Sequence, residues 1–166
     1  MNEDDEERAA DFAEQLPTWW CDDEQVLRDL VAGTLGELTN LDLEPIDENM
    51  WFVQVDGHRC LVSVQDLDRG VEVSTALAYD VPSTCGAAKT VLGFNRDGSP
   101  ARHWVSESQM LMAAARVSAR PFVGAHLVEA IQIVFGASAE GHHAAAACGG
   151  VPARKASSEH GQHELQ

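Results

Sequence analysis

Histidines near the C-terminus have the residue type and spacing that come nearest to a metal site. His142 and His143 are adjacent, and His160 and His163 form a His-x-x-His pair. A zinc ion needs three or four ligands held in a fixed tetrahedral arrangement. Because no third ligand lies at a fixed spacing from these histidines, we predict no metal site, and no other pattern indicates a cofactor.

Four cysteines are the candidates for thiol chemistry: Cys21, Cys60, Cys85 and Cys148. No two of them form a Cys-x-x-Cys pair, and neither a cysteine nor a serine lies in a known nucleophile signature. Scattered cysteines of this kind are commonly small buried side chains. The chain also lacks a glycine-rich phosphate loop. We therefore predict no catalytic residues and a protein that is not an enzyme.

One catalytic arrangement is kept as an alternative. A pocket that joins His103 and Glu107 with Cys60 or Cys85 would indicate an enzyme with an unrecognised site. Dispersed positions for these side chains would argue against it.

Tryptophans are the candidates for contact with a partner. Trp19 and Trp20 fall in a linker between two predicted helices, where adjacent residues cannot both point into one core. Exposed aromatic side chains often anchor protein interfaces, although the pair could instead cover the end of a neighbouring helix. Trp51 and Trp104 fall on predicted strands and fit the core face of a sheet. We name all four as candidate partner-binding residues.

The charge of the chain excludes several partners. It has 27 acidic and 11 basic residues in 166, a net charge of −16, and its acidic residues are concentrated in residues 1–50. Nucleic-acid binding needs a basic face, and anionic membrane surfaces repel an acidic protein. The acidic start is unlike a signal peptide, and no apolar stretch could span a bilayer. We predict a cytoplasmic protein with no direct nucleic-acid partner and no membrane partner.

Hydrophobic periodicity predicts the elements that would position these residues. Apolar residues at helical spacing predict a helix over 23–38 with Asp22 as its N-cap. Three stretches with period two predict an antiparallel meander: 51–55, 58–65 and 71–80. Asp56-Gly57 is typical of the tight turn of a hairpin.

The second half of the chain has a mixed pattern. It predicts a helix over 84–94, a strand over 101–106 and a last helix over 121–135 with His126 on its inner side. Residues 109–118 fit either a helix or a strand that pairs with 101–106.

Together these elements predict an α+β fold. It has an antiparallel sheet of about five strands with flanking helices, in the order α-βββ-α-ββ-α. We expect an acidic N-terminal segment over 1–21, with a helix over 3–16, and one domain over 22–136. Residues 137–166 are mostly small or polar and bury too little area to offset the entropy of ordering, so we expect a flexible tail.

Three stretches resemble the YbjN-like and type III secretion chaperone-like family. They are Trp51-Phe52-Val53-Gln54-Val55-Asp56-Gly57 at the start of the meander, Leu92-Gly93-Phe94-Asn95 at the end of the middle helix, and Arg102-His103-Trp104-Val105 in the next strand. The similarity covers about 22–136. The alanine-rich stretch 109–118 departs from the larger apolar residues expected there.

The resemblance implies a small acidic α+β module that has no active site, is often a homodimer, and presents a sheet or groove to a peptide segment of another protein. The acidity, the lack of a catalytic set and the sheet edges that could accept an added strand agree with this. We therefore predict a non-enzymatic, chaperone-like module that binds a protein or peptide client. The alternative is an acidic mimic of nucleic acid that binds a basic protein.

Overall fold

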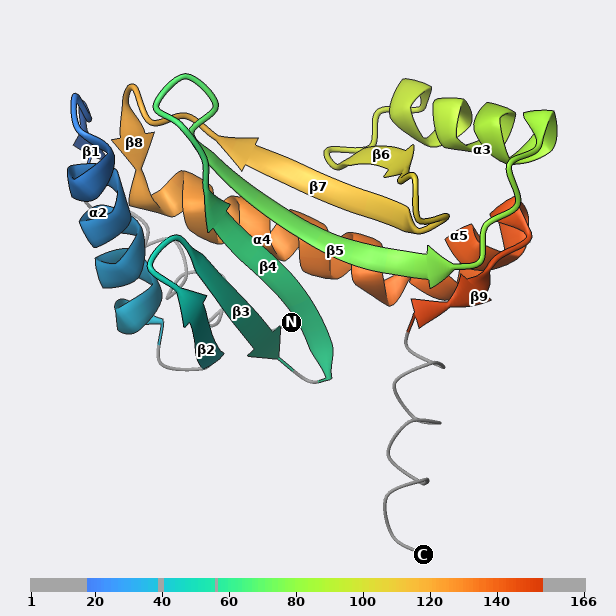
Figure 1. Ribbon diagram of the computed structural model, residues 1–166, viewed down its shortest axis with the longest axis horizontal. Coiled ribbons are helices and arrows are strands. Elements are labelled where there is room, and N and C mark those ends of the chain that lie inside the picture. The colour runs from blue at the N-terminus through green and yellow to red at the C-terminus, as the bar shows by residue number, and fades with distance from the viewer. Residues whose placement is uncertain (1–17, 39–40, 56, 154–166) are drawn as a thin grey trace, which may run out of the picture. The chain divides into compact units, whose positions relative to one another are not determined.

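The computed structural model describes residues 18–38, 41–55 and 57–153 (Figure 1). The predicted helix over 3–16 lies outside the described residues. The fold is α+β, as predicted, and its helices are α2 (Glu24–Glu37), α3 (Cys85–Arg96), α4 (Gly124–Ala139) and α5 (Gly141–Cys148). In the described part of the chain, no helix is long and apolar enough to cross a membrane.

The main sheet is antiparallel and has seven strands, with the hydrogen-bonded order β2-β3-β4-β5-β7-β6 and β9 paired to β5. Its strands are β2 (Asp42–Asp47), β3 (Met50–Val55), β4 (His58–Val64), β5 (Val71–Tyr79), β6 (Arg102–Val105), β7 (Leu111–Val117) and β9 (Val151–Pro152). A separate two-stranded sheet pairs β1 (Thr18–Trp19) with β8 (Phe122–Val123).

The predicted helices over 23–38 and 84–94, the three-strand meander and the strand over 101–106 are confirmed. The open choice over 109–118 is settled as strand β7, which pairs with β6 and places Ala113 opposite His103. The N-cap of α2 is Asp23 rather than Asp22, and the carboxylate of Asp23 accepts a hydrogen bond from the Gln25 backbone N–H at 2.6 Å.

The prediction of about five strands was too low. Strand β2 was missed because its sequence, Asp-Leu-Glu-Pro-Ile-Asp, has little of the apolar alternation that marks a strand, and its side chains are mostly exposed. Strand β9 was missed because it has only two residues. Neither strand has the periodic hydrophobic pattern by which a strand is predicted from sequence.

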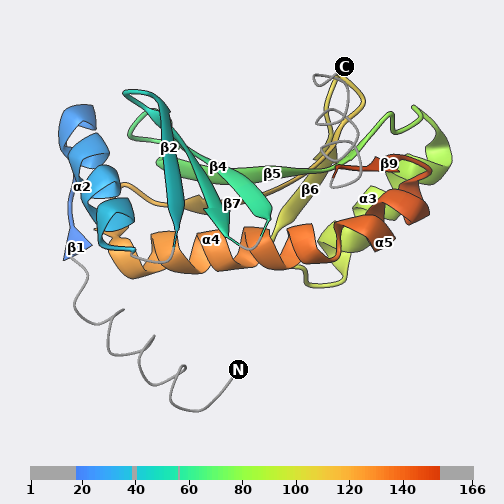
Figure 2. The same cartoon turned by 90° about the horizontal axis from the view of Figure 1, so that it is seen from below.

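The chain forms two compact units. Unit 1 contains the chain up to Gly57, Leu61–Val73 and Arg116–Gln132; unit 2 contains His58–Cys60, Ser74–Ala115 and the chain from Ile133 onward. In unit 1 the largest fully buried side chains come from helices, strands and the start of β8: Leu27, Val31, Leu35, Val53, Val62, Val71, Val73, Phe122 and Leu127. Figure 2 shows α2 and β1 beside the first turns of α4.

Unit 2 has its own apolar core, which involves β5, α3, the β6–β7 hairpin and α5. Its buried members are Leu77, Ala78, Val81, Ala87, Val91, Ala101, Leu111, Ala113, Ala145 and Cys148. Helix α3 begins after Thr84, whose hydroxyl oxygen accepts a hydrogen bond from the Ala87 N–H at 3.2 Å. Most of these core side chains are small, so helices and strands approach one another closely.

The expectation of a flexible tail from residue 137 is wrong for the described residues up to 153. They include the end of α4, all of α5 and strand β9, with Ala145 and Cys148 buried. Small residues permit this packing: a Cβ at Gly150 would lie only 2.8 Å from the Val81 side chain and 2.9 Å from the Tyr79 carbonyl oxygen. Residues 154–166 lie outside the described residues.

Candidate peptide-binding groove

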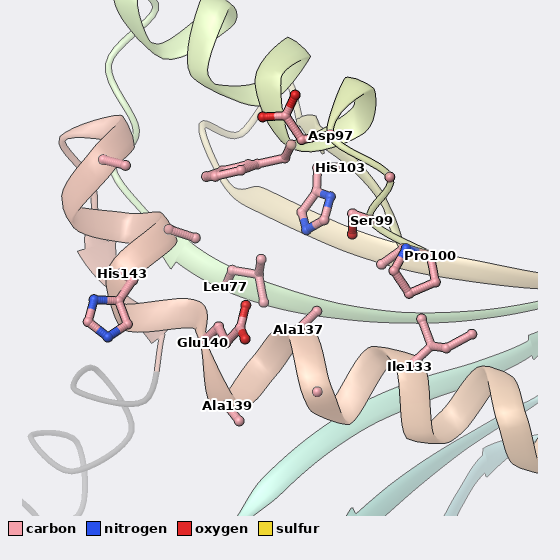
Figure 3. A pocket seen from close by; sticks show the side chains of 16 residues that line it. Leu77, Asp97, Ser99, Pro100, His103, Ile133, Ala137, Ala139, Glu140 and His143 are labelled. Carbon is pink, nitrogen blue, oxygen red and sulfur yellow. The ribbon is translucent and has the colours of Figure 1, made fainter.

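The described residues of unit 2 form a groove. Its volume is about 1000 Å³, the size range of sites that hold small molecules or short peptide segments. Its walls come from the end of α3 and the following loop, from β5 and β6, from the last turns of α4 and from α5 (Figure 3). All of these residues belong to unit 2.

The local sequence explains why the groove stays open. Gly136, Ala137 and Ala139 at the end of α4, with Ala144 and Ala147 of α5, present little side-chain volume to it. A Cβ built at Gly136 would meet no atom within 4 Å. The apolar part of the wall is completed by larger side chains, Leu77, Phe94 and Ile133.

His103 of β6 is the most unusual group in the groove. Its side chain is directed into the cavity (Figure 3), only 8 % of the residue is exposed, and its Nδ1 has no hydrogen-bond partner among the described residues. Its ring contacts that of Phe94, with centroids 5.3 Å apart. Buried polar atoms are nearly always hydrogen-bonded, so the unpartnered Nδ1 makes this ring a candidate binding group.

The backbone around His103 is held by Asn95, at the end of α3. The Asn95 amide Nδ2 donates to the His103 carbonyl oxygen at 2.8 Å, and the His103 N–H donates to Asn95 Oδ1 at 2.7 Å. Asn95 therefore fixes the imidazole at a set position relative to α3. The Leu-Gly-Phe-Asn stretch that carries the family resemblance thus includes both the ring contact and the backbone clamp.

Burial also determines the charge of the imidazole. Desolvation lowers the pKa of His103 from its ordinary value of 6.5, and a hydrogen bond with the Ala101 backbone raises it in part. The ring is therefore neutral at neutral pH. A neutral imidazole can accept one hydrogen bond and donate another.

The charged groups of the groove are acidic. Glu140 directs its carboxylate into it (Figure 3) and forms no capping hydrogen bond to α5, which follows it. Asp97 lies at the rim and forms a 3.1 Å ion pair with Arg96. In the described chain, no lysine or arginine lines the groove.

Both end strands of the sheet are poorly suited to pairing with an added strand. At β6, Asn95 already occupies the outward N–H and C=O of His103. At β2, Pro45 supplies no N–H, and Asp42 and Asp47 put charge on an exposed edge, which discourages pairing. The groove of unit 2 is therefore a better candidate for a client site than either of these two strand edges.

The catalytic arrangement kept as an alternative is not assembled. His103 lines the groove, but Glu107, Cys60 and Cys85 do not. Glu107 is exposed beyond the end of β6, Cys60 is buried in β4, and Cys85 is exposed at the start of α3. The positions are dispersed, which argues against a shared site.

The environments of the thiols and of the other histidines also give no sign of a catalytic or metal site in the described residues. Cys21, Cys60 and Cys148 are buried and Cys85 is exposed, all four as free thiols. Burial raises the pKa of the Cys60 thiol to about 12, the opposite of an activated nucleophile. Across the described ranges, no three His, Cys, Asp or Glu residues are grouped to hold a metal ion, whereas His160 and His163 lie outside them. His126, expected on the inner side of the last helix, is exposed.

The four tryptophans do not form one site. Trp19 and Trp20 are 54 % and 65 % exposed, and β1 holds Trp19 opposite Phe122 of β8. Trp51 and Trp104 are half-buried rather than fully in the core. Trp19, Trp20 and Trp51 belong to unit 1, whereas Trp104 belongs to unit 2 and does not line the groove.

Sequence reasoning named His103 as part of a family stretch but missed its role in the groove, and it missed Glu140 altogether. The available signal was the run of small residues on either side of Glu140, Gly-Ala-Ser-Ala before it and four alanines after it. In a helical register such residues create a surface that larger side chains cannot fill.

The described residues thus form an α+β fold whose unit 2 carries a groove with apolar side chains in its wall. Residues 25–156 match the family described as "T3SS (YopN, CesT) and YbjN peptide-binding chaperone 1", TY-Chap1. The match covers most of the chain, and the protein belongs to this family. The predicted resemblance is therefore confirmed, and it extends beyond residue 136. No curated protein and no solved structure gives a significant match.

Proposed function

We propose that this protein is a chaperone-like module that binds an extended or partly folded segment of a client protein in the unit 2 groove. The observation that carries the proposal is the cavity of about 1000 Å³, whose wall combines apolar side chains with the buried His103. Membership of a peptide-binding chaperone family supports the same role.

The composition of the groove fits such a client. Apolar side chains at Leu77, Phe94 and Ile133 offer contact area to side chains that a client leaves exposed before it folds. Their small neighbours leave room for a peptide backbone to approach. Binding of this kind needs no bond-making chemistry, which agrees with the dispersed thiols and carboxylates.

The proposal is tested by panning a phage-displayed random peptide library on the protein and then measuring the affinity of selected peptides by fluorescence anisotropy. Gly136→Leu would place a side chain in the groove where the wild type has open space. We expect it to weaken selected peptides by at least about tenfold. The leucine also raises helix propensity, so α4 should remain folded.

Gly33→Leu is the matched control. Gly33 is an exposed glycine inside helix α2 of unit 1, and a Cβ there also meets no atom within 4 Å. This variant should bind selected peptides like the wild type. Equal binding by the two variants would show that the groove is not the client site, and failure to select any peptide would contradict peptide binding itself.

Other expectations remain proposals. We propose a cytoplasmic location, and a homodimer remains compatible with the family. Contact with a partner through Trp19, Trp20, Trp51 or Trp104 is likewise still a prediction. The nucleic-acid mimic stays an alternative that rests on net charge alone, and its binding to a basic protein would be lost at high salt.

A further inference from the structure

Two of the polar side chains that line the groove, His103 and Glu140, indicate what kind of client side chain it holds. The Nδ1 atom of His103 is buried without a hydrogen-bond partner in the described chain. The carboxylate of Glu140 forms no capping bond to α5. Figure 3 shows both directed into the same groove from different walls.

We infer that the groove selects a client segment that carries a lysine or arginine beside apolar residues, with the cationic group between the His103 ring and the Glu140 carboxylate. This inference rests on the proposed function, because it names the class of segment bound at the same site.

Hydrogen-bond chemistry favours a cation over other side chains. Lysine and arginine carry only donors, and the neutral His103 ring and the Glu140 carboxylate both offer acceptors. A cationic side chain is therefore the chemical complement of both groups. A purely apolar occupant would leave His103 Nδ1 buried and unpartnered, which costs free energy.

Charge points in the same direction. The described lining includes two carboxylates, Glu140 and Asp97, and two histidines, His103 and His143, but no lysine or arginine. Arg96 pairs with Asp97 at 3.1 Å, but its side chain is 82 % exposed, so solvent screens that pair. An acidic client side chain would meet two carboxylates and no fixed cation.

The apolar wall supplies the rest of the recognition. Phe94, Leu77 and Ile133 can cover the methylene stem of a lysine or arginine while its charged end reaches the polar groups. The same wall accepts apolar neighbours in the client. The expected motif is therefore a basic residue within an apolar stretch, not a run of basic residues.

The test uses a set of fluorescein-labelled synthetic peptides, Ser-Leu-Ala-X-Leu-Ala-Ser, in which X is lysine, norleucine or glutamate. Norleucine keeps the stem of lysine and removes its charge. Anisotropy titrations of the full chain at physiological salt should show lysine binding about tenfold tighter than norleucine, the factor expected for a charge-assisted hydrogen bond. Glutamate should bind most weakly. The ¹⁵N resonance of His103 Nδ1 should shift with the lysine peptide and not with norleucine.

Two variants assign the preference to these residues. Glu140→Gln keeps the shape of an exposed side chain and removes its charge, and it should reduce the lysine-over-norleucine ratio to about threefold. His103→Phe removes Nδ1 and keeps an aromatic ring beside Phe94, and it should reduce the ratio in the same way. Glu107→Gln is the control, because Glu107 is an exposed glutamate of unit 2 outside the groove.

The outcomes separate this inference from the proposed function. If the peptides bind the wild type and lose affinity in Gly136→Leu, but lysine and norleucine bind equally, the inference is overturned and the proposed function stands. A preference for glutamate, or a lysine preference unchanged in Glu140→Gln, would also overturn the inference. If library selection yields no peptide that depends on Gly136, the proposed function itself fails.

Discussion

The two halves of helix α4 pack in opposite ways. Its first half belongs to unit 1, where Leu127, Ala130 and Ile131 are almost completely buried. Its second half belongs to unit 2, where Val134 is buried but Ile133 is only partly covered and Gly136 borders open space. One continuous helix thus completes a dense core in unit 1 and borders a groove in unit 2.

The difference shows that the groove results from side-chain volume rather than from a break in secondary structure. The backbone of α4 continues from Gly124 to Ala139, while the sequence changes from large residues to Gly-Ala-Ser-Ala. If the proposed function is right, stability and binding depend on different stretches of the same helix. Substitutions along α4 can test this division directly.

The largest loss of stability is expected for a substitution in the first half of α4, which packs in the core of unit 1. Leu127→Ala removes a fully buried side chain, so it should lower the free energy of unfolding by about 2–5 kcal/mol. Ile133→Ala removes the same number of carbon atoms from a partly exposed position that lines the groove, and it should cost less than half as much. Urea denaturation followed by circular dichroism measures both. Equal losses would contradict the division of α4 into a packed and an open half.

Replacing a glycine by alanine should lower the stability of the protein at Gly70 in unit 1 and raise it at Gly136 in unit 2. Gly70, between β4 and β5, has φ +72, and its Cβ would collide with the Val117 carbonyl oxygen. Gly70→Ala should therefore destabilise the protein by on the order of 1–3 kcal/mol.

Gly136→Ala is the counterpart in unit 2. Its Cβ enters open space inside a helix, so it should stabilise the protein by about 0.5–1 kcal/mol. Thermal unfolding of both variants gives the comparison. Destabilisation of both would mean that the groove wall at Gly136 is closed in solution.

The strongly periodic elements could be predicted from sequence, because large apolar side chains at fixed spacing specify which face is buried. This holds for α2, with Leu27, Val31 and Leu35 in line, and for the meander strands β3, β4 and β5. The same reasoning failed for α5, whose buried residues include Gly141, Ala145 and Cys148. Small side chains bury area only because Leu77 and its neighbours lie close, and that proximity is a tertiary property.

The groove could not be predicted for a related reason. A void is defined by the atoms that are missing between elements, and the small residues around Glu140 indicate it only once their neighbours in space are known. His103 could be placed on a strand from sequence. That its Nδ1 has no hydrogen-bond partner could not be predicted, because it depends on which residues, such as Phe94, pack around the ring. Glu140 lay in a segment expected to be flexible, so its position opposite that ring had no basis in sequence.

Lowering the pH should reduce the free energy of unfolding, because His103 is buried as a neutral ring. Burial lowers its folded-state pKa below the ordinary 6.5, so the unfolded chain binds the proton more readily than the folded one. The stability contributed by the neutral ring is complete above pH 6.5 and is lost as pH falls through the lower folded-state value. Phe94 and Asn95 beside the ring carry no charge, and the lowering of the pKa by burial is offset only in part by the hydrogen bond with the Ala101 backbone.

The measurement is the free energy of unfolding between neutral and mildly acidic pH for the wild type and for His103→Gln. The variant should show a shallower loss than the wild type, by less than the effect of Leu127→Ala. His126→Gln, which replaces an exposed histidine on α4, should follow the wild-type curve. Parallel curves for the wild type and His103→Gln would show that the ring is accessible to protons and water without cost.

The smallest effect is expected at the aromatic surface of unit 1. Trp19 and Trp20 are exposed, but they do not line the groove of unit 2. Trp19→Ala combined with Trp20→Ala should leave the affinity of groove-selected peptides within about threefold, or ~0.7 kcal/mol. Anisotropy titration gives the affinity, and circular dichroism confirms the fold. A loss beyond tenfold in a folded variant would show that client binding uses unit 1 as well, and the contrast between a packed unit and a binding unit would no longer hold.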